Sequence, residues 1–170
     1  AALQFVCSDM WQPYRKVIAK KASAALHILD RFHIVARLNK AIDDVRAAET
    51  KDLARAGYEP VLTHSRWCFL KRPENLTPKQ QTRLDDLLRY GLQTVRAYLL
   101  KESFQALWEY TSYHWAGVFL DGWLKRALRS RLEPIKTVAR SIRTHQTLIL
   151  NWFAARKEFS SGIVEGLNYR

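Results

Sequence analysis

Two short apolar runs near the start of the chain, each ending at an aspartate, most constrain its fold. Residues 2–8 form the first run, which ends at Asp9, and residues 25–29 form the second, which ends at Asp30. A helical spacing of apolar residues follows each run, which makes a strand–helix–strand–helix order typical of a parallel α/β sheet. We therefore expect both aspartates at the carboxyl ends of neighbouring strands, where open α/β sheets bind ligands.

The rest of the chain carries a different pattern. A long helix is predicted from Arg31 to about Ala56, with Ile34, Leu38, Ile42 and Val45 as its core stripe, and Gly57 ends it. From Pro78 to Phe153 we find only helical periodicity and no strand alternation. Helices are predicted over 78–89, 92–110, 115–130 and 134–155. An all-helical block of this size after an α/β beginning indicates an insertion, and the chain should be predominantly helical.

The charge of the chain indicates a polyanionic partner. There are 28 Lys and Arg residues against 16 Asp and Glu residues, a net charge of +12. Nucleic acid explains such an excess better than an anionic membrane surface does, although a basic protein without such a partner has the same composition. No apolar run approaches the ~20 residues that cross a bilayer, and a membrane-surface protein would not explain the aspartates at the strand ends, so no membrane partner is expected. Two cysteines make no disulfide framework and favour a reducing cytoplasm.

A one-signed basic stretch occupies the end of the helical block. Between positions 125 and 143 there are seven basic residues and one acidic residue, Glu133. Such a ridge can follow DNA phosphates and release their counterions, but a solvated helix face has the same pattern. The candidate DNA-binding residues are Lys125, Arg126, Arg129, Arg131, Lys136, Arg140 and Arg143.

Five of the six tryptophans lie in the predicted helical region, at positions 67, 108, 115, 123 and 152. Their spacing relative to apolar neighbours predicts that they pack in the core. The alternative is that some of them stack on an unpaired base, because they alternate with basic residues.

The acidic candidates also have ordinary structural explanations. Asp9 and Asp30 each precede a helix, so each can be a helix N-cap. Glu165 falls in the first turn of a predicted helix, where the helix dipole favours a carboxylate without any function. His33 can be an ordinary residue of an amphipathic helix. Their sequence contexts decide between the explanations.

Several motifs in register resemble one protein family. Three of them contain the candidate residues, and three more lie between them: residues 6–11 (VCSDMW), 29–33 (LDRFH), 64–67 (HSRW), 71–76 (KRPENL), 129–134 (RSRLEP) and 160–168 (SSGIVEGLN). In order and spacing they resemble the DDE transposases of the L3 type of bacterial insertion sequence, along essentially the whole chain. The resemblance implies a ribonuclease-H-like catalytic fold that is interrupted by a helical insertion.

The resemblance also implies roles for single residues. Asp9 matches the second carboxylate of the family's Asp-Asp-Glu triad, and Glu165 matches the third. Both would bind Mg²⁺, with two ions in the complete enzyme and Mn²⁺ as a substitute. Asp30 and His33 match an Asp-x-x-His motif that is expected to support the site. The first Asp of the triad is expected upstream of Ala1, so we expect a fragment that is inactive alone.

These implications define an expected organisation. Residues 1–57 would be a partial ribonuclease-H-like α/β core, 58–158 the helical insertion, and 159–170 the start of the helix that carries the third carboxylate. The expected activity is metal-dependent DNA cleavage and strand transfer during transposition of an insertion sequence. The expected partners are duplex DNA, at transposon ends and target, and further copies of the full-length protein near the bacterial nucleoid. The alternative is a non-catalytic helical DNA-binding protein that occupies transposon ends.

Overall fold

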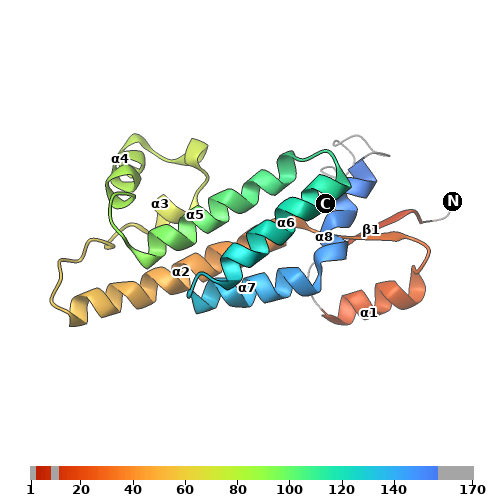
Figure 1. Cartoon of the computed structure of the whole chain (residues 1–170), viewed down its shortest axis with the longest axis horizontal. Coiled ribbons are helices and arrows are strands. Elements are labelled where there is room, and N and C mark those ends of the chain that lie inside the picture. Colours follow the sequence, from red (N-terminus) through yellow and green to blue (C-terminus); the bar gives the residue numbers. More distant parts are fainter. Residues whose placement is uncertain (1–2, 9–11, 157–170) are drawn as a thin grey trace.

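The computed structural model describes residues 3–8 and 12–156. Its first elements are strand β1 (Phe5–Ser8), helix α1 (Gln12–Lys21) and strand β2 (Leu26–Leu29). The strands are parallel, with Phe5 opposite Leu26 and Ser8 opposite Leu29. They lie with α1 at one end of an elongated molecule (Figure 1). The predicted parallel strand–helix–strand arrangement is confirmed.

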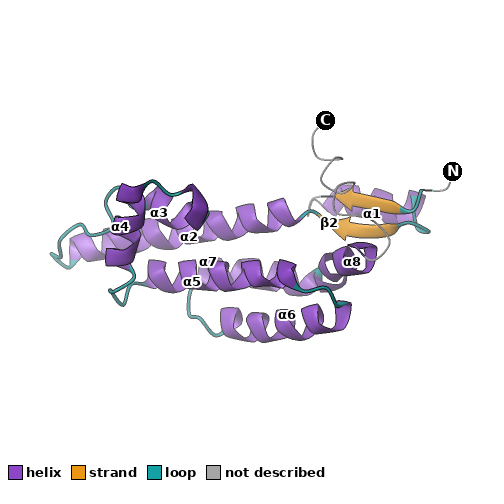
Figure 2. Cartoon of the chain, turned by 90° about the horizontal axis from the view of Figure 1, so that it is seen from above, coloured by secondary structure: helices purple, strands orange, loops and turns teal. Residues whose placement is uncertain are grey.

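Helix α2 (Arg31–Arg55) is the longest element and runs from β2 through the body of the molecule (Figure 2). Its buried stripe contains the four apolar residues expected from the sequence, which are Ile34, Leu38, Ile42 and Val45. Helix α2 ends where Gly57 takes a φ of +75°, a left-handed conformation that glycine adopts at little cost.

Short and medium-length helices complete the described chain. They are α3 (Arg66–Leu70), η1 (Pro73–Asn75), α4 (Pro78–Leu87), α5 (Gln93–Gln105), η2 (Ala106–Glu109), α6 (Tyr113–Leu128), α7 (Glu133–Thr144) and α8 (Gln146–Arg156). Helices α5 and α7 both pack against α2, and α8 packs beside β2. The described residues are therefore predominantly helical, as the sequence predicted. No described helix is long and apolar enough to cross a membrane.

One predicted helix is wrong in its extent. The pattern over 134–155 predicts a single helix, whereas α7 ends at Thr144 and α8 begins at Gln146. His145 interrupts the helix with φ −112° and ψ 16°. It is 9% exposed, and its ring contacts Arg15 of α1 and the carbonyl of Ser141. A tertiary contact to the α/β end thus overrides the local helical pattern.

Helix α5 is held to α2 by a buried carboxylate. Glu49 of α2 accepts hydrogen bonds from the backbone N–H groups of Gln93 and Thr94, at 2.7 and 2.8 Å, and from the Thr94 hydroxyl at 2.6 Å. These amides lie in the first turn of α5, where no helical carbonyl can accept from them. A residue 44 positions earlier in the sequence therefore caps the helix.

Candidate functional site

The carboxyl ends of β1 and β2 meet at one edge. The backbone N–H of Asp30 donates a 2.9 Å hydrogen bond to the carbonyl of Ser8, the last residue of β1. The Asp30 side chain caps α2, because Oδ1 accepts the Phe32 N–H at 2.8 Å. His33 lies one turn into the helix, with Nε2 3.8 Å from Asp30 Oδ2. The structure thus brings Asp30 and His33 to the end of β1.

The two residues expected to bind metal lie outside the described residues. Asp9 follows Ser8 directly in the sequence, and Glu165 follows the described chain by nine positions, since α8 ends at Arg156. Among the residues that are described, no three His, Cys, Asp or Glu side chains group so that they could hold a metal ion. The assignment of Asp9 and Glu165 as metal ligands stays a prediction.

A cysteine beside the strand edge responds to the Asp30 charge. Cys7 is exposed as a residue, but desolvation around its sulfur raises the pKa of the thiol to about 11, and the negative charge of Asp30 adds to this shift. The thiol is therefore protonated at neutral pH and is a poor nucleophile. The shift also shows that the Cys7 side chain and the Asp30 carboxylate are close enough to interact.

Histidine 27 was not predicted as part of the site. Its Nε2 lies 2.7 Å from the hydroxyl of Ser8, and its backbone carbonyl accepts a 2.8 Å hydrogen bond from the Asn151 amide of α8. Burial lowers the pKa of His27, and the charge of Arg15 lowers it further by a smaller amount. Both effects favour the neutral ring. The only sequence signal was a polar residue within the apolar run 25–29.

The Asn151 side chain also bonds the outer edge of β2. The N–H groups of Leu26 and Asp30 both point toward β1, where they bond Gln4 and Ser8 carbonyls. Because N–H and C=O of one strand residue point to the same side and alternate along the strand, the His27 carbonyl points away from β1. The Asn151 side chain of α8 accordingly satisfies a carbonyl on the outer edge of β2.

A second polar junction connects α1 to the break between α7 and α8. His145 Nδ1 lies 2.6 Å from the Ser141 carbonyl, and a terminal nitrogen of Arg15 contacts His145 Nε2. A carbonyl can only accept and a guanidinium can only donate, so this ring is neutral with its proton on Nδ1. Burial lowers the pKa of His145, as do the charges of Arg15 and Arg37, against an opposing effect of the Ser141 hydrogen bond.

The basic residues selected from the sequence lie on α6, α7 and the turn between them. All are exposed except Lys136, which is half-buried. Glu133 accepts from Lys136 Nζ and from Arg140 Nη1, both at 2.8 Å. These two hydrogen bonds lower the pKa of the exposed Glu133 carboxylate, the Lys136 bond more than the Arg140 bond. Two of the three positive residues of α7 thus contact one acid, and helices α6 and α7 pack together.

The expectation that the tryptophans pack in the core is only partly correct. Trp123 is fully buried, and Trp108 and Trp152 are partly buried against the core. Trp67 and Trp115, in contrast, are 52% and 60% exposed. Both lie on helices whose other faces supply the apolar packing, so their indole rings remain at the surface.

Comparison with known proteins agrees with the motifs in the sequence. A family model described as a transposase matches residues 1–170. The chain is 29% identical to the transposase for insertion sequence element IS1001 of Bordetella parapertussis, over 98% of this chain and 41% of that protein. It is 28% identical to the transposase for insertion sequence element IS1557 of Mycobacterium tuberculosis, over 99% of this chain and 42% of that protein. The chain thus spans less than half the length of these relatives, and no solved structure matches it.

Proposed function

Because the chain belongs to the transposase family of L3-type insertion sequences, we propose that it is the part of a catalytic domain that carries the second and third carboxylates of an Asp-Asp-Glu triad. The parallel pairing of β1 and β2 carries this proposal. It joins the last residue before Asp9 to the backbone of Asp30 by the bond from Asp30 N–H to the Ser8 carbonyl. Open parallel sheets bind their ligands at this kind of edge.

The donor chemistry of the proposed site suits Mg²⁺. Asp9 and Glu165 offer carboxylate oxygens, which are the hard ligands that Mg²⁺ prefers. We propose that Asp9 and Glu165, together with an upstream Asp of the complete protein, would hold two such ions. A metal pair of this kind stabilises the attacking and leaving oxygens of an in-line displacement at phosphorus. Asp30 is not proposed as a ligand, because its Oδ1 already accepts the Phe32 N–H at the start of α2.

The residues around the edge would position the reacting groups. The Ser8 hydroxyl is within hydrogen-bond distance of His27, so the end of β1 is held from the side chain as well as from the backbone. His33 is more than half exposed and lies beside Asp30, where it can contact a DNA phosphate. The basic residues of α6 and α7 would bind duplex DNA through its phosphates. We propose a ribonuclease-H-like sheet in which β1 is paired with a further strand on its other edge.

Plasmid nicking tests the proposal. The protein would be a longer chain that includes the upstream segment, assayed with Mg²⁺ and compared as wild type, Asp9→Asn and Glu165→Gln. Both variants should lose cleavage while they keep DNA binding and folding. Glu59→Gln is the matched control, since Glu59 is an exposed acid beyond the end of α2, and this variant should cleave normally.

Two results would contradict the proposal. Cleavage that survives both Asp9→Asn and Glu165→Gln would show that other groups bind the metal. DNA binding without any cleavage by a longer chain with an intact upstream Asp would support the alternative, in which the protein occupies transposon ends without catalysis.

A further inference from the structure

Helix α3 is fixed to the rest of the molecule by one face. Cys68 and Phe69 are buried, and the Phe69 ring meets the Tyr98 ring of α5 edge-on at 5.7 Å. The buried Lys101 of α5 donates a 3.0 Å hydrogen bond to the Phe69 carbonyl. These contacts hold the short helix in one orientation, so the residues on its other face have defined positions.

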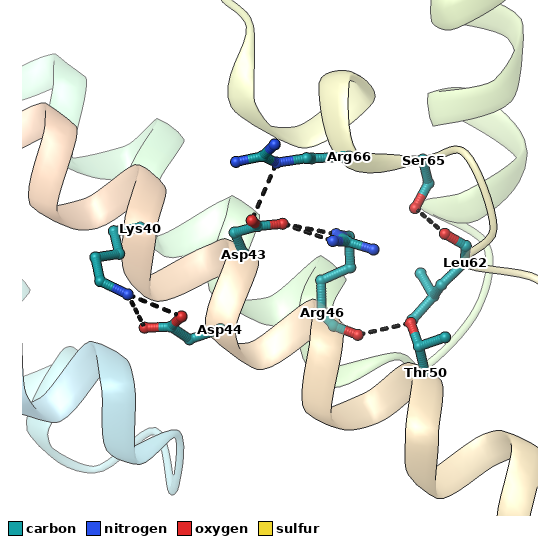
Figure 3. A network of polar contacts seen from close by, with 8 residues as sticks. All are labelled: Lys40, Asp43, Asp44, Arg46, Thr50, Leu62, Ser65 and Arg66. Atoms are coloured by element: carbon teal, nitrogen blue, oxygen red, sulfur yellow. Dashed lines mark hydrogen bonds and ion pairs between the residues drawn. The ribbon is translucent and has the colours of Figure 1, made fainter.

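The outward face of α3 presents Arg66 and Trp67. Trp67 keeps 52% of its surface exposed, and the Arg66 guanidinium carbon lies 5.2 Å from the centre of its ring. Arg66 forms an ion pair with Asp43 of α2, in which Nε lies 3.0 Å from Oδ2. Figure 3 shows that the two terminal nitrogens of Arg66 point away from Asp43. Asp43 therefore holds the guanidinium through Nε, and the two terminal nitrogens are available to a ligand.

The turn before α3 also defines this geometry. His64 has a φ of 58°, a left-handed conformation that is uncommon outside glycine. The next residue, Ser65, is fully buried, and its hydroxyl donates a 2.6 Å hydrogen bond to the Leu62 carbonyl (Figure 3). Asp43 accepts hydrogen bonds from Arg46 within α2 and pairs with Arg66, so its carboxylate is held in place and connects α2 to the start of α3.

The surrounding segment is strongly basic, as the ridge on α6 and α7 is. Positions 61–83 contain five Lys or Arg residues and one acidic residue, Glu74. This second basic segment contains α3, η1 and most of α4, and α3 packs on α2 and α4. An exposed indole within a positive segment combines the two features that bind single-stranded nucleic acid, which are an aromatic surface for a base and cations for the backbone.

We propose that Arg66 and Trp67 form a binding site for a DNA nucleotide whose base has left the helical stack. The base stacks on the exposed Trp67 ring, and the terminal nitrogens of Arg66 bind a phosphate oxygen of the same strand. Asp43 is a positioning residue that fixes the rotamer of Arg66. This inference rests on the proposed function, since both need a DNA partner, but it concerns a surface that the proposed catalytic edge does not include.

The role of Asp43 makes the inference sharply testable. From charge alone, removal of an acid beside a DNA site should strengthen binding, and it also frees Arg46. If Asp43 positions Arg66, its removal should instead weaken binding, because the Arg66 side chain then becomes ordered only when the ligand binds, which costs conformational entropy. Asp44 is the matched control: it is the next residue of α2, it is exposed, and it pairs with Lys40 instead (Figure 3).

The experiment measures binding of the 170-residue chain to a fluorescein-labelled short duplex with one unpaired thymine, and to the same duplex fully paired. Trp67→Ala should weaken binding of the first probe about tenfold and of the second much less, and Trp67→Phe should restore most of the loss. Asp43→Ala should weaken binding of the first probe about fivefold, whereas Asp44→Ala should not weaken it. Trp115→Ala, which removes another exposed indole, from α6, should have no effect.

Three outcomes would overturn the inference. The first is equal binding of the unpaired probe by wild type and Trp67→Ala, which would show that no base stacks on Trp67. The second is tighter binding by Asp43→Ala. The third is no DNA binding by the wild-type chain, which would also remove the DNA contact in the proposed function. Circular dichroism melting of each variant separates a loss of binding from a loss of folding.

Discussion

Glu49 and Thr94 are joined by two hydrogen bonds to the same carboxylate oxygen, one from the Thr94 amide at 2.8 Å and one from its hydroxyl at 2.6 Å. Glu49 is 8% exposed and Thr94 is fully buried. Replacement of Glu49 by Ala should lower the free energy of unfolding by about 3 kcal/mol, because three donors lose their acceptor in the interior. Urea unfolding measures the loss. Glu59→Ala, at an exposed position, should cost less than about 0.5 kcal/mol, and equal effects would disprove the role of the cap.

The N-cap of α2 can be tested apart from any catalytic role. Asp30→Ala should lower the free energy of unfolding by about 1 kcal/mol, because the Phe32 amide loses its acceptor. Asp30→Asn keeps an oxygen acceptor and should be nearly as stable as wild type. If Asp30→Asn were as unstable as Asp30→Ala, the cap would not be the source of the stability.

The Asp30→Asn substitution should also change the reactivity of Cys7. Because the Asp30 charge contributes to the raised thiol pKa of about 11, Asp30→Asn should lower that pKa and increase the thiolate fraction. Iodoacetamide should therefore alkylate Cys7 faster in the variant at about pH 8.5. Mass spectrometry of the peptide that contains Cys7 gives the rate separately from that of the buried Cys68. An unchanged rate would mean that the two side chains are not close.

Stability should fall as the solution is acidified below neutrality. The folded-state pKa values of His145 and His27 are lowered from 6.5, so the unfolded chain takes up protons first. Their contribution is therefore complete above about pH 6.5 and is lost as the pH falls toward the folded-state values. Urea unfolding at about pH 7.5 and about pH 5.5 measures the difference. His145→Gln should reduce it, whereas His114→Gln, at an exposed position on α6, should leave it unchanged.

The basic residues of α7 should contribute to DNA binding through charge. Arg140→Ala combined with Arg143→Ala should lower the slope of log affinity against log salt by about two units, since each phosphate contact releases about one counterion. Lys51→Ala combined with Arg55→Ala removes the same charge from the end of α2 and should change the slope less. Fluorescence anisotropy with a duplex at several salt concentrations measures both. Equal slopes in the two variants would mean that α7 is only a solvated face.

The fold was predicted from periodicity where local pattern and tertiary packing agree. The apolar runs near Asp9 and Asp30 gave the parallel strands, and the spacing of Ile34 and Leu38 gave the buried face of α2. The interruption at His145 was missed, because it depends on contacts with Arg15, which lies 130 positions earlier. No local periodicity contains that information.

The site was predictable to a smaller degree. Motifs selected Asp30 and His33, and the pairing of strands explains why they lie beside the end of β1. His27 and Asn151 could not be selected, because each has an unremarkable sequence context and acquires its role only through a neighbour in space. Trp67 was assigned to the core for the same reason, since spacing alone does not show which face of a five-residue helix packs.

The uninterrupted length of α2 has a geometric consequence. Asp43 lies thirteen positions after Asp30. At a rise of 1.5 Å per residue, the strand edge and the Asp43–Arg66 ion pair are therefore about 20 Å apart along the axis of α2. On B-form DNA this distance corresponds to about six base pairs. One residue inserted between Asp30 and Asp43 would rotate everything beyond it by about 100°, so the Asp43–Arg66 pair would face a different direction relative to the strand edge. If both ends of α2 contact one DNA molecule, as proposed, the length of this helix can therefore vary only by whole turns.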